Sequence, residues 1–172
     1  TTRVASFTSD GLTLTGNLSY VNNASDNYIT QLFKINGGTT SSNSDGSITS
    51  TVQANATAGM SIVKYTGTGS AATVGHGLGK KPDWIIIKRL NNANGWWTVY
   101  CSKATSSDTE SFSTDPETDY LELGHNASLA DDATRFNDTA PTTSVFSIKD
   151  ANAVNASGSD YVAYCFAAIK GF

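Results

Sequence analysis

The sequence predicts an all-β protein, an antiparallel β-sandwich of jelly-roll or lectin-like kind with six to ten strands. Short runs of β-branched and aromatic residues recur along the chain, separated by Asn, Gly and Ser. Only 15% of the residues are charged, and Ser, Thr, Asn and Gly supply much of the remaining polarity, a composition that favours strands and turns over helices. The length of 172 residues suits one well-buried domain.

The predicted strands follow one another at the intervals typical of a sandwich. They are "MSIVKYT" (60–66), "DWIIIKRL" (83–90), "WWTVYC" (96–101), "DYLELG" (119–124), "SVFSI" (144–148) and "DYVAYCFAAI" (160–169). The loop "NNANG" between the second and third predicts a tight hairpin, because Asn and Gly tolerate left-handed conformations. One short helix is expected within "NASLADDATRF" (126–136), since no stretch keeps a 3.6-residue period for three turns.

The glycine-rich stretch "VGHGLGKKPDWIIIKR" (74–89) invites comparison with a phosphate-binding loop. A Walker loop has Gly five residues before its Gly-Lys and Ser or Thr after it, whereas Val74 and Lys81 stand at those places. The glycines at 75, 77 and 79 do not form G-x-G-x-x-G either, and a strand follows where a helix should begin. Residues 75–82 are therefore predicted to be a strand connection, whose glycines supply positive φ and whose Pro82 fixes the approach to the next strand.

An internal repeat places similar segments at the two ends of the chain. "YVNNASDNYITQLFKI" (20–35) aligns without a gap with "AVNASGSDYVAYCFAA" (153–168), and with one residue of slack "DGLTL" (10–14) aligns with "SVFSI" (144–148). Each copy predicts a hairpin of a short strand, a polar turn and a long strand. We expect a hairpin unit (1–36), a Ser/Thr/Gly/Asn-rich linker (37–49) and a β-sandwich module (50–172), forming one structural unit overall, with the two hairpins in related positions of successive modules or subunits.

The strand "WWTVYC" carries the only residues proposed for ligand binding. Alternation places Trp96, Thr98 and Tyr100 on one face and Trp97, Val99 and Cys101 on the other. The second set is the more apolar and is predicted to face inward. Trp96 and Tyr100 would then lie outward, where they could stack on a sugar or on a neighbouring subunit, although burial under a second sheet or a loop is the more common fate of such aromatics.

Metal and cofactor sites find little support in the sequence. His76, Cys101, His125 and Cys165 could be drawn as a zinc set, but no two are close in sequence and C-x-x-C spacing is absent. Cys165 aligns with Leu32 in the repeat, which favours a core cysteine. The acidic loop 106–119 carries Asp108, Glu110, Asp115, Glu117 and Asp119 without the ligand order of an EF-hand, so a solvated loop is favoured over a calcium site. We expect no metal and no cofactor.

Catalysis and two classes of partner are also disfavoured. Neither histidine belongs to a nucleophile and base arrangement, and only Glu122 and the acidic loop offer carboxylates for a glycan hydrolase, so no enzymatic activity is expected. The formal charge of −4 and pI near 4.9 disfavour nucleic-acid binding. The longest apolar run, "YVAYCFAAI", has nine residues and is too short to cross a membrane.

Three segments together resemble a module of uncharacterised function that recurs in virion proteins of marine tailed phages, often in tandem in tail-fibre-like chains. They are "GMSIVKYTGTGSAATVGHGLGKKPDWIIIKR" (59–89), "NDTAPTTSVFSI" (137–148) and "VNASGSDYVAYCFAAIKGF" (154–172). The resemblance covers residues 50–172, and the segment before it resembles the end of a preceding module. It implies a structural or adhesive virion role and no catalytic residues.

These observations predict a structural component of a phage particle, repeated in a fibre, tail or head appendage, with a host-adhesion role in addition. Its expected partners are copies of itself, other virion proteins and host surface glycans, and its expected location is the virion. A weakly charged surface rich in Ser, Thr and Asn suits close subunit packing, since burying charge at an interface is costly. The alternative is a lectin-like module that recognises host surface glycans through Trp96 and Tyr100.

Overall fold

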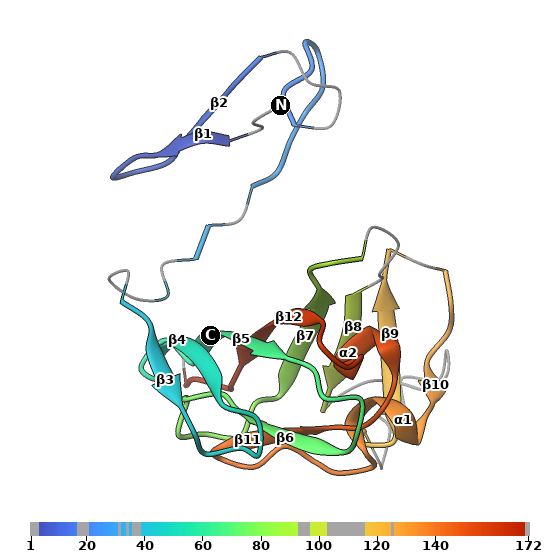
Figure 1. Cartoon of the computed structure of the whole chain (residues 1–172). Helices are drawn as coiled ribbons and strands as arrows, with labels where there is room; N and C mark the ends of the chain where they lie inside the picture. The colour runs from blue at the N-terminus through green and yellow to red at the C-terminus, as the bar shows by residue number, and fades with distance from the viewer. Residues whose placement is uncertain are drawn as a thin grey trace. The chain divides into compact units, whose positions relative to one another are not determined.

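The structure, a computed structural model, has the predicted all-β fold (Figure 1). It describes residues 4–16, 21–30, 32–33, 35, 39–92, 97–102, 116–124 and 126–170. The chain divides into two units, residues 1–34 and residues 35–172, and the boundary lies close to the predicted one at residue 36.

The N-terminal unit contains one short hairpin. Strand β1 (Val4–Phe7) pairs antiparallel with β2 (Leu12–Leu14), and the turn is closed by the amide of Thr8, which donates to the carbonyl of Gly11 at 2.9 Å. Residues 21–30 follow without a strand. The second half of the predicted N-terminal hairpin is therefore not a strand in the described residues of this unit.

The larger unit is built on an antiparallel sheet of eight strands in the order β10-β9-β8-β7-β12-β5-β4-β3. These strands are β3 (Ser41–Asn43), β4 (Ser50–Asn55), β5 (Met60–Thr66), β7 (Trp84–Arg89), β8 (Trp97–Cys101), β9 (Asp119–Leu123), β10 (Ala130–Asp131) and β12 (Asp160–Phe166). A second layer is formed by β6 (Ala72–Gly75) and β11 (Val145–Ile148), which pair antiparallel. The described residues add two four-residue helices, α1 (Ala133–Phe136) and α2 (Asn152–Asn155).

Strand β12 lies at the centre of the large sheet, between β5 and β7. Its seven residues alternate between buried and half-buried, so Tyr161, Ala163 and Cys165 face the core. Pairing on both edges satisfies the backbone of the strand, and burial of one face fixes its register.

The core lies between the two layers and is rich in aromatic residues. The ring of Tyr65 stacks on Tyr161 with centroids 5.2 Å apart and meets Phe146 edge to face at 6.1 Å. The hydroxyl of Tyr65 donates to the carbonyl of Val154 at 2.7 Å, so its one polar atom is satisfied at depth. Strand β11 and helix α2 are thereby joined to the central strands of the sheet.

Six predicted strands are confirmed, but the predicted pairing of the last two is wrong. The predicted hairpin would join 144–148 to 160–169, yet β11 pairs with β6, while β12 pairs with β5 and β7. Helix α2 lies between them and carries the chain from one layer to the other. A short strand, a polar stretch and a long strand suit a crossover between layers as well as a hairpin, because alternation does not identify the pairing partner.

The predicted linker 37–49 also needs correction, because part of it belongs to the sandwich. Residues 41–43 form β3, which pairs with β4, and Ile48 is buried in the core and bridges to Val74. A polar edge strand gives a weak sequence signal, since charged or small polar residues are common on exposed edges.

The glycine loop is a strand connection, as predicted, leading from β6 in one layer to β7 in the other. Gly77 and Gly79 have φ of 70° and 65°, values that L residues with side chains rarely adopt. Gly75 is needed for a different reason, because a Cβ there would lie 1.6 Å from Oδ1 of Asn43.

None of the described helices is long and apolar enough to cross a bilayer.

Candidate binding surface on the outer face of the sheet

The face of the eight-stranded sheet that is turned away from β6 and β11, here called the outer face, is unusually apolar for a partly exposed surface. Alternation along each strand brings aromatic and aliphatic side chains to this face beside two lysines, one aspartate and one threonine. The residues at these positions on β5, β7, β8 and β12 are Met60, Ile62, Lys64, Thr66, Trp84, Ile86, Lys88, Trp97, Val99, Cys101, Asp160, Val162, Tyr164 and Phe166.

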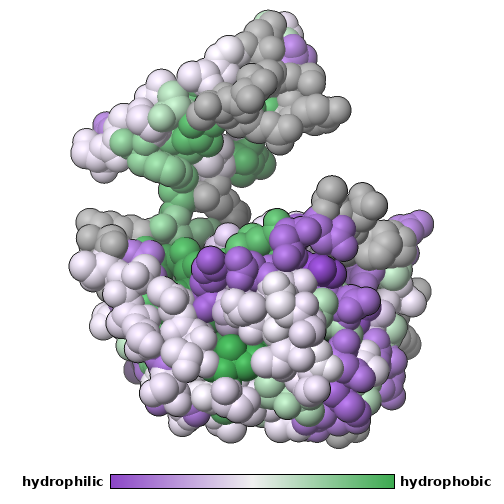
Figure 2. All heavy atoms as spheres, viewed as in Figure 1, coloured by the Kyte–Doolittle hydropathy of each residue, from purple (hydrophilic) through white to green (hydrophobic). Residues whose placement is uncertain are grey.

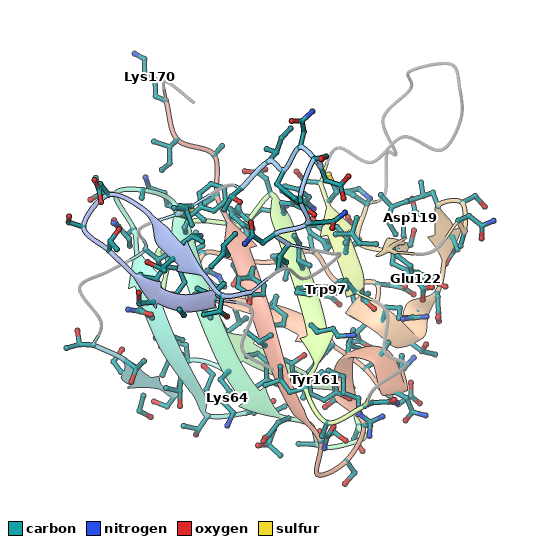
Figure 3. The ribbon with its side chains drawn as sticks, turned by 90° about the horizontal axis from the view of Figure 1, so that it is seen from above. Lys64, Trp97, Asp119, Glu122, Tyr161 and Lys170 are labelled. Atoms are coloured by element: carbon teal, nitrogen blue, oxygen red, sulfur yellow. The ribbon has the colours of Figure 1, made fainter. Side chains whose placement is uncertain are left out.

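Two aromatic pairs lie on the outer face, and one of them contains Trp97, which is labelled in Figure 3. Trp97 stacks on Tyr164 with centroids 6.0 Å apart, and Trp84 packs against Phe166 at 5.6 Å. The Nζ of Lys88 lies 5.9 Å from the Trp97 ring centroid, within range of a cation–π contact. Trp84 remains 42% exposed and Trp97 37% exposed, so part of each indole is open to a partner.

A shallow pocket of about 310 Å³ adjoins Trp97 and is lined by Ile86, Trp97, Leu123 and Gly124. Three of these residues present apolar side chains, and Leu123 is 44% exposed. A sugar-binding site combines an aromatic platform with polar groups that fix the hydroxyls. The lining of this pocket supplies the platform alone, so it suits an apolar side chain of another protein better than a sugar.

The structure corrects the predicted facing of strand β8. Tyr100 is fully buried and packs edge to face against Phe136 with centroids 5.5 Å apart, whereas Trp97 faces outward. Burial raises the pKa of the Tyr100 phenol to about 12, and its hydroxyl has no hydrogen-bond partner among the described residues. Tyr100 therefore cannot stack on a surface ligand in this conformation. Trp96 lies outside the described residues.

The error lay in the phase of the alternation, and Thr98 explains it. Thr98 is fully buried on the same side as Tyr100, and its Oγ1 accepts a hydrogen bond from Nη1 of Arg135 at 3.0 Å. The sequence pattern places Thr98 towards solvent because its hydrogen-bond partner lies 37 residues away along the chain. Arg135 on α1, whose side chain is 14% exposed, supplies that partner on the inner side of β8.

Arg135 is the centre of a polar cluster on the inner side of β8 and β9. Its Nη2 lies 3.1 Å from Oε1 of Glu122, and the two side chains are only 14% and 9% exposed. Its guanidinium also covers the Tyr120 ring at 4.1 Å. Glu122, a carboxylate considered for hydrolysis, is thus engaged in an ion pair that holds α1 against the sheet.

Asp132, the N-cap of α1, completes this cluster. It accepts from the amide of Thr134 at 2.9 Å and lies 3.3 Å from Nε of Arg135. Burial acts to raise the pKa of Asp132, but the bonds from Thr134 and Arg135 outweigh it, so the pKa lies below its ordinary value. The charged form is the one that caps the helix.

Two of the residues drawn as a zinc set, His76 and Cys165, have separate structural roles. His76 is buried, its Nδ1 accepts from the amide of Leu78 at 3.2 Å, and its Nε2 faces the carbonyl of Thr142 at 3.3 Å, which selects the neutral tautomer with the proton on Nε2. Burial lowers the pKa of His76 despite the Thr142 carbonyl and Asp45, which act to raise it. Cys165 is buried, and desolvation raises its pKa to about 12.

No group of three or more potential metal ligands occurs in the part of the chain that the structure describes. Both cysteines are free thiols, Cys165 in the core and Cys101 half-buried. His125 and the acidic residues Asp108, Glu110 and Asp115 lie outside the described residues, so the calcium alternative stays a prediction.

The whole chain, residues 1–172, belongs to a family described as a domain of unknown function, DUF7483. None of the curated proteins and none of the solved structures matches it. The family is defined without an activity.

Proposed function

We propose that this chain is a structural component of a phage particle, repeated in a fibre, tail or head appendage, and that copies of it pack through the outer face of the sheet. The observation that carries the assembly role is the exposure of Trp84, Trp97 and Leu123 on this face, where Trp97 and Leu123 line an apolar pocket. Large apolar groups gathered on one exposed face are typical of protein interfaces. Trp is also enriched among the residues that dominate binding energy at such interfaces.

The surroundings of this patch support packing against a second protein surface. On the outer face of β5, β7, β8 and β12 the charged residues are Lys64, Lys88 and Asp160, and Lys64 pairs with Asp160 at 3.7 Å. Burying this face would therefore desolvate few charges, and isolated buried charge is the costly part of forming an interface. Aromatic and aliphatic groups would supply most of the area.

The phage context rests on a different kind of support, the resemblance of residues 59–89, 137–148 and 154–172 to modules of phage virion proteins. The test is mass spectrometry of purified phage particles whose genome encodes this chain. Detection at many copies per particle supports the proposal, and absence from complete particles overturns it.

The second candidate is a lectin-like module, and the exposed indole of Trp97 favours it. Aromatic rings stack on the apolar faces of sugars, and Lys88 beside Trp97 could donate to a hydroxyl. The site would use Trp97, in place of the predicted pair Trp96 and Tyr100. The apolar lining of the pocket makes this candidate the weaker one.

Sedimentation velocity of the purified chain separates the two functions. Assembly through the outer face predicts a concentration-dependent oligomer that is lost in Leu123→Lys, because the new charge would be buried at the interface. Leu90→Lys is the matched control, since Leu90 is also exposed but lies outside the pocket. A strict monomer at high concentration contradicts the assembly role.

A glycan array completes the comparison. Binding to defined glycans by a monomer, lost in Trp97→Ala, would establish the lectin-like function. No glycan binding together with a Leu123→Lys-sensitive oligomer would support the structural one.

A further inference from the structure

The N-terminal unit repeats part of the sequence and local hydrogen bonding of the end of the sandwich, although residues 21–30 do not form a strand. Residues 20–35 align without a gap with residues 153–168, a segment that contains most of α2 and all of β12. The structure shows that the likeness extends to individual hydrogen bonds.

The first shared feature is the turn that precedes the short strand. The amide of Thr8 donates to the carbonyl of Gly11 at 2.9 Å, and the amide of Thr142 donates to the carbonyl of Val145 at 2.8 Å. The Thr8 hydroxyl also contacts Asp10 at 3.0 Å, two residues ahead, as the Thr142 hydroxyl contacts Ser144 at 3.5 Å. The two turns therefore correspond, and β2 corresponds to β11.

The second shared feature is an asparagine that reaches back across six residues. Nδ2 of Asn22 donates to the carbonyl of Gly16 at 2.9 Å, and Nδ2 of Asn155 donates to the carbonyl of Lys149. In the sandwich, Asn155 is fully buried and also bonds the loop before β6, accepting from the amide of Thr68 at 2.7 Å. Asn22 is exposed.

The third shared feature is a tyrosine that closes the turn after this asparagine. The hydroxyl of Tyr28 accepts from the amide of Asn23 at 2.9 Å, and the hydroxyl of Tyr161 accepts from the amide of Ala156 at 2.7 Å. These residues match one to one in the alignment. Three local features thus agree among the described residues of 8–16 and 21–28.

The two copies differ sharply in burial. Tyr161 and Cys165 are fully buried, whereas their counterparts Tyr28 and Leu32 are 42% and 54% exposed. Ile29 is 94% exposed, and its counterpart Val162 is half-buried. Figure 2 shows apolar residues gathered on the surface of the N-terminal unit. The segment has the side chains of a central strand without the sheet that would cover them.

We propose that residues 8–35 complete the sandwich of a second module of this kind, occupying the place that β11, α2 and β12 occupy in residues 39–170. Residues 28–33 would lie between strands equivalent to β5 and β7, and β2 would pair with the equivalent of β6 in place of β1. Main-chain pairing on both edges supplies affinity, and the pockets for alternate side chains supply specificity.

The partner must be a module whose place for the last strand is vacant. In residues 39–170 that place is filled by β12, which pairs with β5 over seven residues and with β7 over six. A complete copy of the sandwich therefore offers no site. The place between the equivalents of β5 and β7 is distinct from the outer face of the sheet. The inference can therefore fail while the proposed function holds, and the reverse.

An extended chain tests the proposal, with the unmodified chain as reference. Residues 39–141 are joined directly ahead of Thr8, the counterpart of Thr142, so that residues 8–35 follow an otherwise incomplete module. Hydrogen exchange of the amides of residues 28–33 is the readout. We expect their exchange to slow about 100-fold or more relative to the unmodified chain, as for amides that open only with a folded core.

Two substitutions in the extended chain separate strand insertion from nonspecific collapse. Leu32→Asp places a charge at the counterpart of buried Cys165 and should abolish the protection. Ile29→Ser alters the counterpart of half-buried Val162 and should keep most of it. A second extended chain carries residues 142–168 in place of 8–35. It is the positive control, because its exchange rates show the protection that a complete module provides. Unchanged exchange of residues 28–33, or protection that survives Leu32→Asp, would overturn the proposal.

Discussion

The two faces of strand β7 differ in environment although they are equally apolar in sequence. Ile85 and Ile87 point inward and are fully buried, while Trp84 and Ile86 point to the outer face, where Trp84 is 42% exposed. An uninterrupted apolar run is typical of a strand that is covered on both sides. The inner face of β7 contributes Ile85 and Ile87 to the core, whereas the apolar side chains of its outer face are not part of that core.

Replacing the two isoleucines in turn gives the largest expected contrast. Ile87→Ala should lower the free energy of unfolding by about 3 to 4 kcal/mol, because it leaves a cavity in a core that cannot fully collapse. Ile86→Ala should cost about 1 to 2 kcal/mol, since Ile86 is half-buried and lies beside an open pocket. Urea denaturation followed by tryptophan fluorescence measures both. Equal losses would show that the outer face is as well packed as the core.

The buried polar cluster on the inner side provides the next largest effect. Arg135→Ala should cost about 3 kcal/mol, because Glu122, only 9% exposed, would lose its charged partner. The exposed pair of Lys64 and Asp160, with 58% and 45% of the side chains accessible, is the matched control. Lys64→Ala should change stability by less than about 0.5 kcal/mol. A small effect of Arg135→Ala would mean that water replaces the guanidinium.

The comparison also shows which parts of the fold the sequence could reveal. Strand positions follow from local periodicity, so β5 matches its predicted bounds, and β7, β8 and β9 fall within a residue or so of theirs. Partners and phase depend on contacts distant in sequence. On β8, the inward face is the one that carries Thr98, which bonds Arg135 on α1. Strand β11 is separated from β12 by α2 and pairs with β6. Strand β6 has only four residues, too few for its alternation to predict a strand.

The candidate site was less predictable than the fold, for the same reason. Strand 96–101 is the one predicted to carry ligand-binding residues, but a one-residue error of phase assigns Tyr100 to the surface and Trp97 to the core. The internal repeat was the more informative signal. It located Tyr28 and Leu32 as counterparts of core residues, and only the structure could show that they are exposed.

The pH dependence of the free energy of unfolding tests the contribution of His76, whose Nε2 bonds the carbonyl of Thr142 ahead of β11. Because its folded pKa is lowered, the neutral form contributes stability above the ordinary histidine pKa of about 6.5, and this contribution is lost as the pH falls below that value towards the folded pKa. One such group gives a slope of at most about 1.4 kcal/mol per pH unit. Chemical denaturation between pH 7.5 and pH 5 should show the decline.

The His76→Gln variant should remove this decline at the cost of lower stability at pH 7, because glutamine does not ionise. Asp132 acts in a separate window, since its lowered pKa gives stability that is lost only as the pH falls below about 3.9. A decline between pH 7.5 and pH 5 that persists in His76→Gln would assign it to other groups.

The two cysteines lie on opposite faces of the sheet and should differ in their reactivity towards a maleimide. Cys101 is half-buried on the outer face opposite Trp84, and Cys165 is buried in the core. A thiolate is the reactive form, and burial raises the pKa of Cys165 to about 12, so a maleimide at neutral pH should label Cys101 and leave Cys165 unmodified in the native protein. Mass spectrometry after digestion gives the labelled positions, and in denaturant both thiols should react. Native labelling of Cys165 at the rate of Cys101 would show that the central strand opens readily, and that the two faces of the sheet differ less in dynamics than in burial.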